Sequence, residues 1–260
     1  MNTSSNRSRR RFIKLLGLTA ASLTWGGLYW WRQLPTVNEA IVIDPGHGGF
    51  DPGVVVQGLR EADVALEISL LLYDQLRAKG LPVLLTRSED QHLNRDKLQD
   101  LAARSAFTRQ HCQLFISVHA NAAEPSSVQG IETYIFGRAS QGLNHETAQA
   151  HAQRENGASP WWPTNDPRQS LTARSVQASE CVQRQLIRAT GARDRGVRRN
   201  VFYVLRQSQA PAMLVETGFL TNAEERRLLA NSSYRSLIAA AIADGVEEYL
   251  ELQAAAQTDS

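Results

Sequence analysis

The stretch IVIDPGHGG, at residues 41–49, decides the fold of this 260-residue chain. Three β-branched apolar residues are followed by an aspartate, a proline and a turn with three glycines, which is the pattern of a buried strand that ends in a tight turn. Glycine permits such a turn because it carries no Cβ. His47 stands in that turn, so we expect its imidazole at the carboxyl edge of a sheet, where open α/β folds build their sites.

Strand and helix patterns alternate along the rest of the chain. Residues 114–118 are apolar without interruption, as in a strand that is covered on both faces. The predicted strands are 40–43, 81–86, 114–118, 130–136, 201–205 and 212–215, and the predicted helices are 61–79, 93–110, 171–190, 222–230 and 234–252. This order predicts a single α/β domain with a mostly parallel, twisted sheet of about six strands, flanked by helices on both faces.

Two of the predicted helices have apolar positions at helical spacing. In the helix at 61–79, Val64, Ile68, Leu72 and Leu76 recur at every fourth position and form one apolar stripe. In the helix at 93–110, we expect the inner face to consist of Leu98, Leu101, Ala102 and Phe107. Both helices are therefore predicted to pack against the sheet.

Residues 1–34 are interpreted as a targeting segment outside the fold. Paired arginines at 9–11, Phe12 and Lys14 precede a stretch without charge at 15–31, which matches the twin-arginine export pattern. No clear cleavage site follows, and Trp and Tyr residues gather at 25–31. Removal of the signal and its retention as a membrane anchor therefore both stay open.

The remaining chain divides into four parts. We expect a linker at 35–39, a folded domain at 40–252 and a disordered tail at 253–260. The polar segment at 139–168 interrupts the alternation of strands and helices and is predicted to be an insertion in the domain. Its Trp161 and Trp162 either stack on a ligand or cap the core.

Composition narrows the class of protein. Hydrophobic residues make up 42% of the chain, which suits an ordinary globular domain. Six of the 28 basic residues and none of the 26 acidic ones lie in residues 1–34, which leaves 22 basic against 26 acidic residues in the rest. That excess of acid argues against nucleic-acid binding. The two cysteines, Cys112 and Cys181, are interpreted as small buried hydrophobic residues, with a disulfide left open.

Three residues at strand ends or in adjoining loops form a candidate metal site. They are His47, Glu61 and His119, and two imidazoles with one carboxylate form a zinc set that leaves a position for water. Glu216, at the end of a buried strand, is the candidate general base. Other interpretations stay open at this point: structural histidines, a helix-capping role for Glu61, and a Glu216–arginine pair.

The same segments resemble the zinc-dependent N-acetylmuramoyl-L-alanine amidases of the type-3 amidase family. That family opens with D-P-G-H-G-G, matched at 44–49, and continues with a glutamate at the start of a helix, matched by Glu61. Its later motifs are T-R, S-x-H-A-N and V-E-x-G-F-x-[ST]-N, matched at 86–87, 117–121 and 215–222. The resemblance covers residues 40–250, in order and with every motif present.

The resemblance implies roles for these residues. His47, Glu61 and His119 would bind one zinc ion per chain, and Glu216 would be the catalytic acid–base. The bond cleaved would be the amide between the lactyl group of N-acetylmuramic acid and L-alanine of the peptidoglycan stem peptide. Three roles stay open for Arg87 and Arg195: binding a peptide carboxylate, bracing the acidic groups, or holding the loops as structural brackets. For Asn121, the roles left open are contacting the substrate and holding its loop.

The resemblance also implies a cellular setting and leaves alternatives. We expect a monomer in the periplasm or cell envelope, with an activator protein at the division site as a partner. In some relatives, a longer helix at the position of this insertion plugs the zinc site. For the shorter insertion of this chain to act in the same way, its Glu146 or Glu155 would have to reach the zinc. The alternatives are a zinc amidohydrolase for a different amide and a silent or regulated amidase-like wall-binding protein that recruits other hydrolases.

Overall fold

The computed structural model describes residues 40–109, 112–137 and 167–258. The targeting segment, the linker and nearly all of the insertion predicted at 139–168 lie outside these residues. Within the described part of the chain, no helix is both long and apolar enough to cross a membrane.

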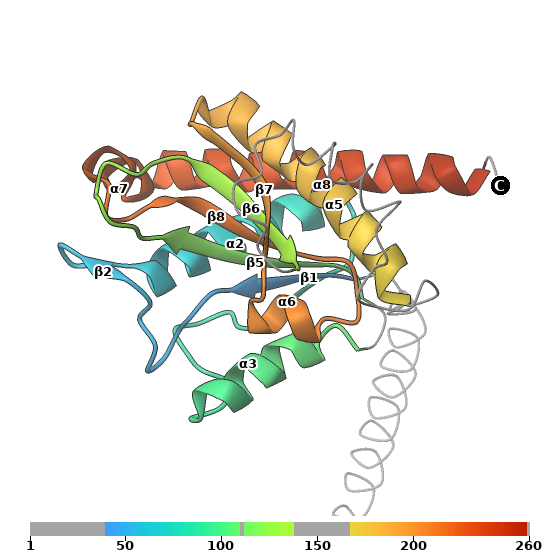
Figure 1. The fold of residues 1–260 in the computed structure, drawn as a ribbon, viewed down its shortest axis with the longest axis horizontal. Coiled ribbons are helices and arrows are strands. Elements are labelled where there is room, and N and C mark those ends of the chain that lie inside the picture. Colours follow the sequence, from blue (N-terminus) through green and yellow to red (C-terminus); the bar gives the residue numbers. More distant parts are fainter. Residues whose placement is uncertain (1–39, 110–111, 138–166, 259–260) are drawn as a thin grey trace, which may run out of the picture. The chain divides into compact units, whose positions relative to one another are not determined.

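A six-stranded sheet forms the centre of the domain, in the order β4-β1-β5-β8-β6-β7 (Figure 1). The strands are β1 (Ala40–Pro45), β4 (Val83–Leu85), β5 (Cys112–Asn121), β6 (Ile131–Phe136), β7 (Asp194–Asn200) and β8 (Ala212–Phe219). All neighbours are parallel except β6 and β8, which run antiparallel. The predicted fold class is thereby confirmed.

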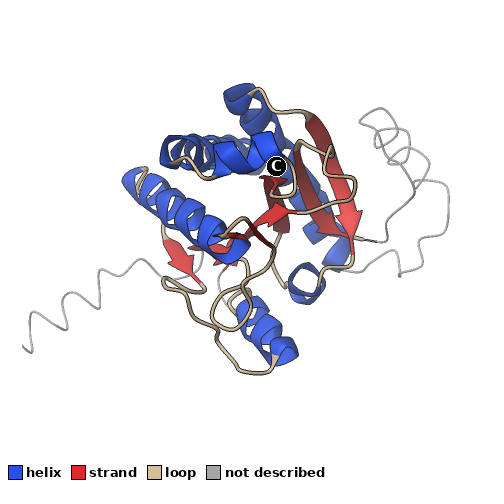
Figure 2. Cartoon of the chain, turned by 90° about the vertical axis from the view of Figure 1, so that its left-hand side faces the viewer, coloured by secondary structure: helices blue, strands red, loops and turns tan. Residues whose placement is uncertain are grey.

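Helices cover both faces of the sheet (Figures 1 and 2). One face carries α2 (Glu61–Ala78), α5 (Pro167–Thr190) and α8 (Ser232–Thr258), and the other carries α3 (Lys97–Ala106) and α6 (Tyr203–Gln207). Every residue of β1 and β8 is buried, as expected for strands between two helical layers. The smaller elements are the hairpin of β2 (Val55–Val56) and β3 (Leu59–Arg60), and α7 (Ala223–Leu229).

The strand predicted at 201–205 is wrong. The edge strand is β7 (Asp194–Asn200), and α6 begins three residues later, at Tyr203. β7 is a polar strand, and it is held by backbone pairing with β6 rather than by an apolar face. Val204 and Leu205 are buried on a single turn of helix, and a short apolar run does not distinguish that helix from a strand by periodicity.

Two helices also differ from their predictions. α3 is shorter than the helix predicted at 93–110, because Asp96 caps its amino end by accepting a hydrogen bond from Gln99 N. Its predicted inner residue Leu98 is 55% exposed, whereas Asp100 and Arg104 are buried. α8 extends to Thr258 instead of ending at 252, so the predicted tail is helical as far as residue 258. Cys112 and Cys181 are free thiols.

Candidate functional site

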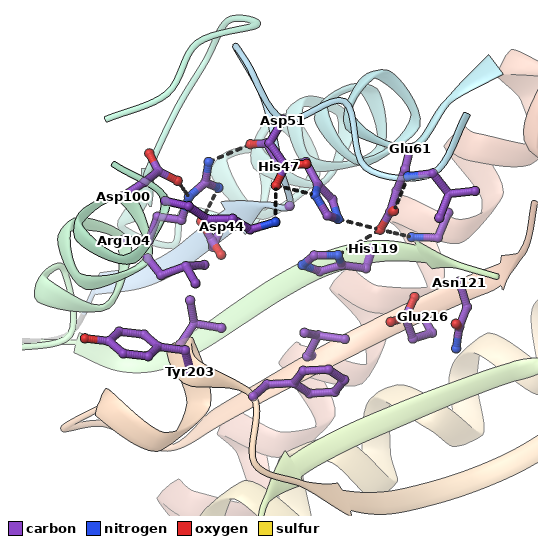
Figure 3. Close-up of a pocket in the computed structure, with 18 of the residues that line it drawn as sticks. Asp44, His47, Asp51, Glu61, Asp100, Arg104, His119, Asn121, Tyr203 and Glu216 are labelled. Atoms are coloured by element: carbon purple, nitrogen blue, oxygen red, sulfur yellow. Dashed lines mark hydrogen bonds and ion pairs between the residues drawn. The ribbon is translucent and has the colours of Figure 1, made fainter. Parts of the chain in front are cut away.

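Three of the predicted site residues lie together. One oxygen of Glu61, Oε1, is 3.0 Å from His47 Nε2 and 2.9 Å from His119 Nδ1. One ligand atom from each residue lies within 4.8 Å of the others, so the group could hold a metal ion (Figure 3). The fold therefore brings together residues that are up to 72 positions apart in the sequence.

Glycines allow this close approach. His47 itself has a φ of +59° in the turn after β1. A Cβ added to Gly46 would lie 2.4 Å from His119 Cε1, and one added to Gly53 would lie 2.6 Å from Glu61 Oε2. Gly53 also has a φ of +65°, which disfavours other residues. The turn is thus shaped around the side chains of the candidate ligands.

Glu61 is held as a carboxylate. Burial raises its pKa, but hydrogen bonds and charge interactions with His119 and His47 outweigh burial and hold the pKa below its usual range. Oε2 accepts a hydrogen bond from Val54 N at 3.0 Å, and Oε1 accepts one from Ala120 N at 3.3 Å. Glu61 is also the first residue of α2, where a negative charge is favoured by the helix dipole. A carboxylate is the form that binds metals.

Asp51 is a site residue that the sequence prediction missed. Its Oδ2 lies 3.0 Å from His47 Nδ1, on the side of the ring away from Glu61, and 3.0 Å from Lys97 Nζ. Burial raises the pKa of Asp51, but these two partners lower it more, to about 2. Metal-ligating histidines commonly have such a carboxylate behind them, which fixes the orientation of the ring. Its place four residues after His47, in a glycine-rich turn, was the available signal.

Glu216 lies opposite His119 in the neighbouring strand. It is 7% exposed and projects into the same cavity as His119 (Figure 3). Its Oε2 is buried without a hydrogen-bond partner among the described residues. Burial, followed by the negative charges of Glu61 and Glu132, raises the pKa of Glu216 well above its usual range. The group is therefore protonated over a much wider range of pH than an ordinary glutamate.

A second buried glutamate, Glu132, was also missed. It lies directly opposite Glu216 across the antiparallel pair of β6 and β8. Arg195 Nε and Asn121 Nδ2 donate hydrogen bonds to its two oxygens, at 2.7 Å and 2.8 Å. Arg195 thus braces an acidic group, which was one of the roles left open for it, and Asn121 holds Glu132. In the sequence, Glu132 resembled an ordinary polar position in an alternating strand.

Buried arginines hold the turn that carries His47. Arg87 is 2% exposed and donates four hydrogen bonds, to the carbonyl oxygens of Pro45, Gly46, Ala62 and Glu89. Arg104 donates to the carbonyl oxygens of Pro45 and His47 and to Asp44 Oδ1. Arg87 is therefore a structural bracket of this turn, which was one of the roles left open for it.

The candidate ligands and Glu216 line one cavity of about 360 Å³. It lies at the carboxyl ends of β1, β5 and β8, the edge at which α/β sheets build their sites. Its apolar walls include Phe50, Phe202 and Tyr203. The volume is within the range of small-molecule sites, and it leaves room for a substrate beside the metal group.

Comparisons with known proteins agree with this geometry. A family model described as N-acetylmuramoyl-L-alanine amidase matches residues 41–248. The chain is 35% identical over 215 residues to the N-acetylmuramoyl-L-alanine amidase LytC of Bacillus subtilis, covering 83% of this chain and 36% of LytC. It is 34% identical over 228 residues to AmiC of Neisseria meningitidis, covering 82% of this chain and 53% of AmiC. The chain thus spans a third to a half of these two relatives.

Solved structures share the fold. The CwlD amidase of Clostridioides difficile, in complex with the GerS lipoprotein, has a TM-score of 0.65 at 28% identity and covers 83% of this chain and 100% of CwlD. The catalytic domain of the amidase CwlV from Bacillus (Paenibacillus) polymyxa has a TM-score of 0.63 at 29% identity, with coverages of 82% and 98%.

Proposed function

Because this chain belongs to the N-acetylmuramoyl-L-alanine amidase family, we propose that it hydrolyses peptidoglycan at the amide between the lactyl group of N-acetylmuramic acid and L-alanine. The observation that carries the proposal is the metal-binding group of His47, Glu61 and His119 with Glu216 directly beside it. An amide hydrolase needs both a metal-ligand set with an open position and a nearby group that moves protons.

Zinc is the metal that fits this group. The group offers two imidazoles and one carboxylate whose ligand atoms lie close together. This set matches the three protein ligands of hydrolytic zinc sites. The ionised state of Glu61 and the carboxylate of Asp51 behind His47 support the same assignment. A bound zinc ion supplies Lewis acidity and lowers the pKa of a bound water to about 7.

Glu216 has the environment of a general acid–base. Its raised pKa brings it closer to the operating pH, where a general acid–base works best. Its unpartnered Oε2 is available to take a proton from the attacking water and to give one to the leaving amine. Both oxygens of Glu132 already accept hydrogen bonds, from Asn121, Tyr134 and Arg195, so Glu216 is the better placed of the two to exchange a proton with the substrate.

We place the protein outside the cytoplasm, because amidases of this family act on the cell wall. Export by the twin-arginine route and a periplasmic location rest on residues 1–34 alone. The complex of CwlD with the GerS lipoprotein supports a protein activator as a partner. We also propose that the protein is a monomer and that its N-terminal segment attaches it to the membrane, and both parts of the proposal rest on the sequence.

The test is release of intact stem peptides from purified peptidoglycan by the zinc-loaded protein. We expect Glu216→Gln to bind one zinc ion and to release peptides about 10²–10⁴-fold more slowly. His47→Ala is expected to lose the zinc ion, and EDTA is expected to abolish release. Absence of both zinc binding and release would contradict the ligand assignment. Zinc binding without release would instead favour the silent or regulated wall-binding protein.

A further inference from the structure

Two arginines of β7 surround one buried carboxylate near the site. Glu132 Oε2 is 2.7 Å from Arg195 Nε and 3.1 Å from Arg198 Nη1. Its other oxygen accepts hydrogen bonds from Asn121 Nδ2 and from the Tyr134 hydroxyl, both at 2.8 Å. Glu132 is 2% exposed. One negative charge therefore faces two positive charges, and the cluster carries one positive charge in excess.

Arg198 is the excess cation. Arg195 is the closer partner of Glu132, its side chain is 20% exposed, and its guanidinium also lies over the Phe219 ring at 5.0 Å. The Arg198 side chain is 38% exposed and forms no ion pair with any other carboxylate among the described residues. A guanidinium offers five N–H donors in a planar fork that matches a carboxylate. Arg198 thus retains donors for an anionic ligand.

Strand register places Arg198 on the cavity face of the sheet. Arg198 lies opposite Tyr134 in β6, and Tyr134 lies opposite Leu214 in β8. Residues opposite each other on neighbouring strands project to the same face. Leu214 and Glu216 both line the cavity, and β7 lies two strands from β8 (Figure 1). The arginine therefore stands beside the site on the side of Glu216.

The spacing suits a short peptide. Two strand separations amount to about 10 Å, and the Arg198 side chain reaches back toward Glu132, which is one strand from Glu216. A dipeptide in extended form spans about 7 Å. A carboxylate on the residue that follows L-alanine would consequently reach the guanidinium while the scissile amide stays at Glu216.

We propose that Arg198 binds a carboxylate of the stem peptide and so determines specificity for the peptide side of the substrate. This inference rests on the proposed amidase function. The glycan offers no comparable negative charge, whereas the stem peptide is attached to the amine that Glu216 would protonate. Glu132 positions Arg198, and Arg195 neutralises Glu132, which leaves the charge of Arg198 for the substrate.

The experiment compares native peptidoglycan with peptidoglycan whose carboxylates have been converted to amides. Initial rates at subsaturating wall concentration, which report kcat/KM, are measured for the zinc-loaded wild type, Arg198→Gln and Arg198→Lys. We expect the wild type to prefer native wall about tenfold, the typical effect of one charge-assisted hydrogen bond. Arg198→Gln is expected to lose about tenfold on native wall and nothing on amidated wall, and Arg198→Lys to keep part of the preference.

Arg199→Gln is the matched control. Arg199 follows Arg198 in the same strand, and because side chains alternate along a strand it projects to the opposite face. There its side chain lies against Gly137, whose Cβ, if present, would be 3.0 Å from Arg199 Cδ. We expect this variant to keep the wild-type preference.

The outcomes separate this inference from the proposed function. Equal cleavage of both walls by the wild type would overturn the role of Arg198 and leave the amidase function intact. An equal loss on both walls in Arg198→Gln would mark a structural role and would also overturn it. If the wild type releases no stem peptides from either wall, the proposed function fails, and this inference fails with it.

Discussion

At the residue scale, the orientation of His47 depends on Asp51. We expect Asp51→Asn to bind zinc about 10–100-fold more weakly than the wild type, because the amide no longer fixes and polarises the imidazole as the carboxylate does. Competition with a chromophoric chelator measures the affinity. Asp74→Asn, a change at an exposed position of α2, is the control. Equal zinc affinity in the wild type and Asp51→Asn would show that Asp51 does not orient His47 and that only its ion pair with Lys97 matters.

The candidate site could be predicted from sequence where each residue marks the end of a strand or the start of a helix. His47, Glu61 and His119 have this position, and the structure brings them together. Asp51 and Glu132 could not be predicted in the same way. Their importance arises from contacts with residues distant in sequence, such as Arg195, and the local pattern around them is that of an ordinary turn and an ordinary strand.

At the scale of elements, Arg104 ties α3 to the turn that carries His47. We expect Arg104→Met to lower the free energy of unfolding by about 3–5 kcal/mol, because it leaves the buried carboxylates of Asp44 and Asp100 without their cation. The variant also removes the hydrogen bond to the His47 carbonyl oxygen, so weaker zinc binding should accompany the loss. Urea unfolding of the metal-free protein measures the effect.

Arg109→Met is the control for that experiment. Arg109 lies close after α3 in sequence and is exposed, so its replacement should change the unfolding free energy by less than about 0.5 kcal/mol. A loss below about 1 kcal/mol in Arg104→Met would contradict the role assigned to the buried network.

The same network explains why one element was misread. The apolar spacing at 93–110 predicted that Leu98 faces inward, but the helix turns its Asp100–Arg104 side to the sheet. Hydrogen bonds from Arg104 to β1 and its turn replace an apolar contact there, and hydrophobic periodicity carries no information about them. In contrast, the helix at 61–79 and the central strands were predicted well, since their burial is almost entirely apolar.

At the scale of the whole molecule, Glu216 makes stability depend on pH. Its pKa is raised in the folded protein, so its burial is harmless below the pKa of the unfolded chain and destabilises the fold as pH rises above that value. We therefore expect metal-free Glu216→Gln to be more stable than the wild type by more than about 1 kcal/mol at pH 8. At pH 4 the difference should nearly vanish.

Chemical denaturation of both proteins at pH 4, 6 and 8 in EDTA checks this expectation. Glu180→Gln, which changes an exposed residue of α5, should follow the wild type at every pH. A stability difference that does not grow with pH would mean that Glu216 ionises freely in the folded protein.

The direction of β6 has a consequence for how this lineage can diverge. Because β6 is antiparallel to β8, it enters the sheet at the edge that holds Glu216 and leaves it at the opposite edge. The hydroxyl oxygen of Ser175 in α5 accepts a hydrogen bond from Ala212 N, so the chain also returns at that opposite edge. We expect insertions and deletions between β6 and α5 to accumulate over evolution, because a change in the length of this connection need not move the metal ligands.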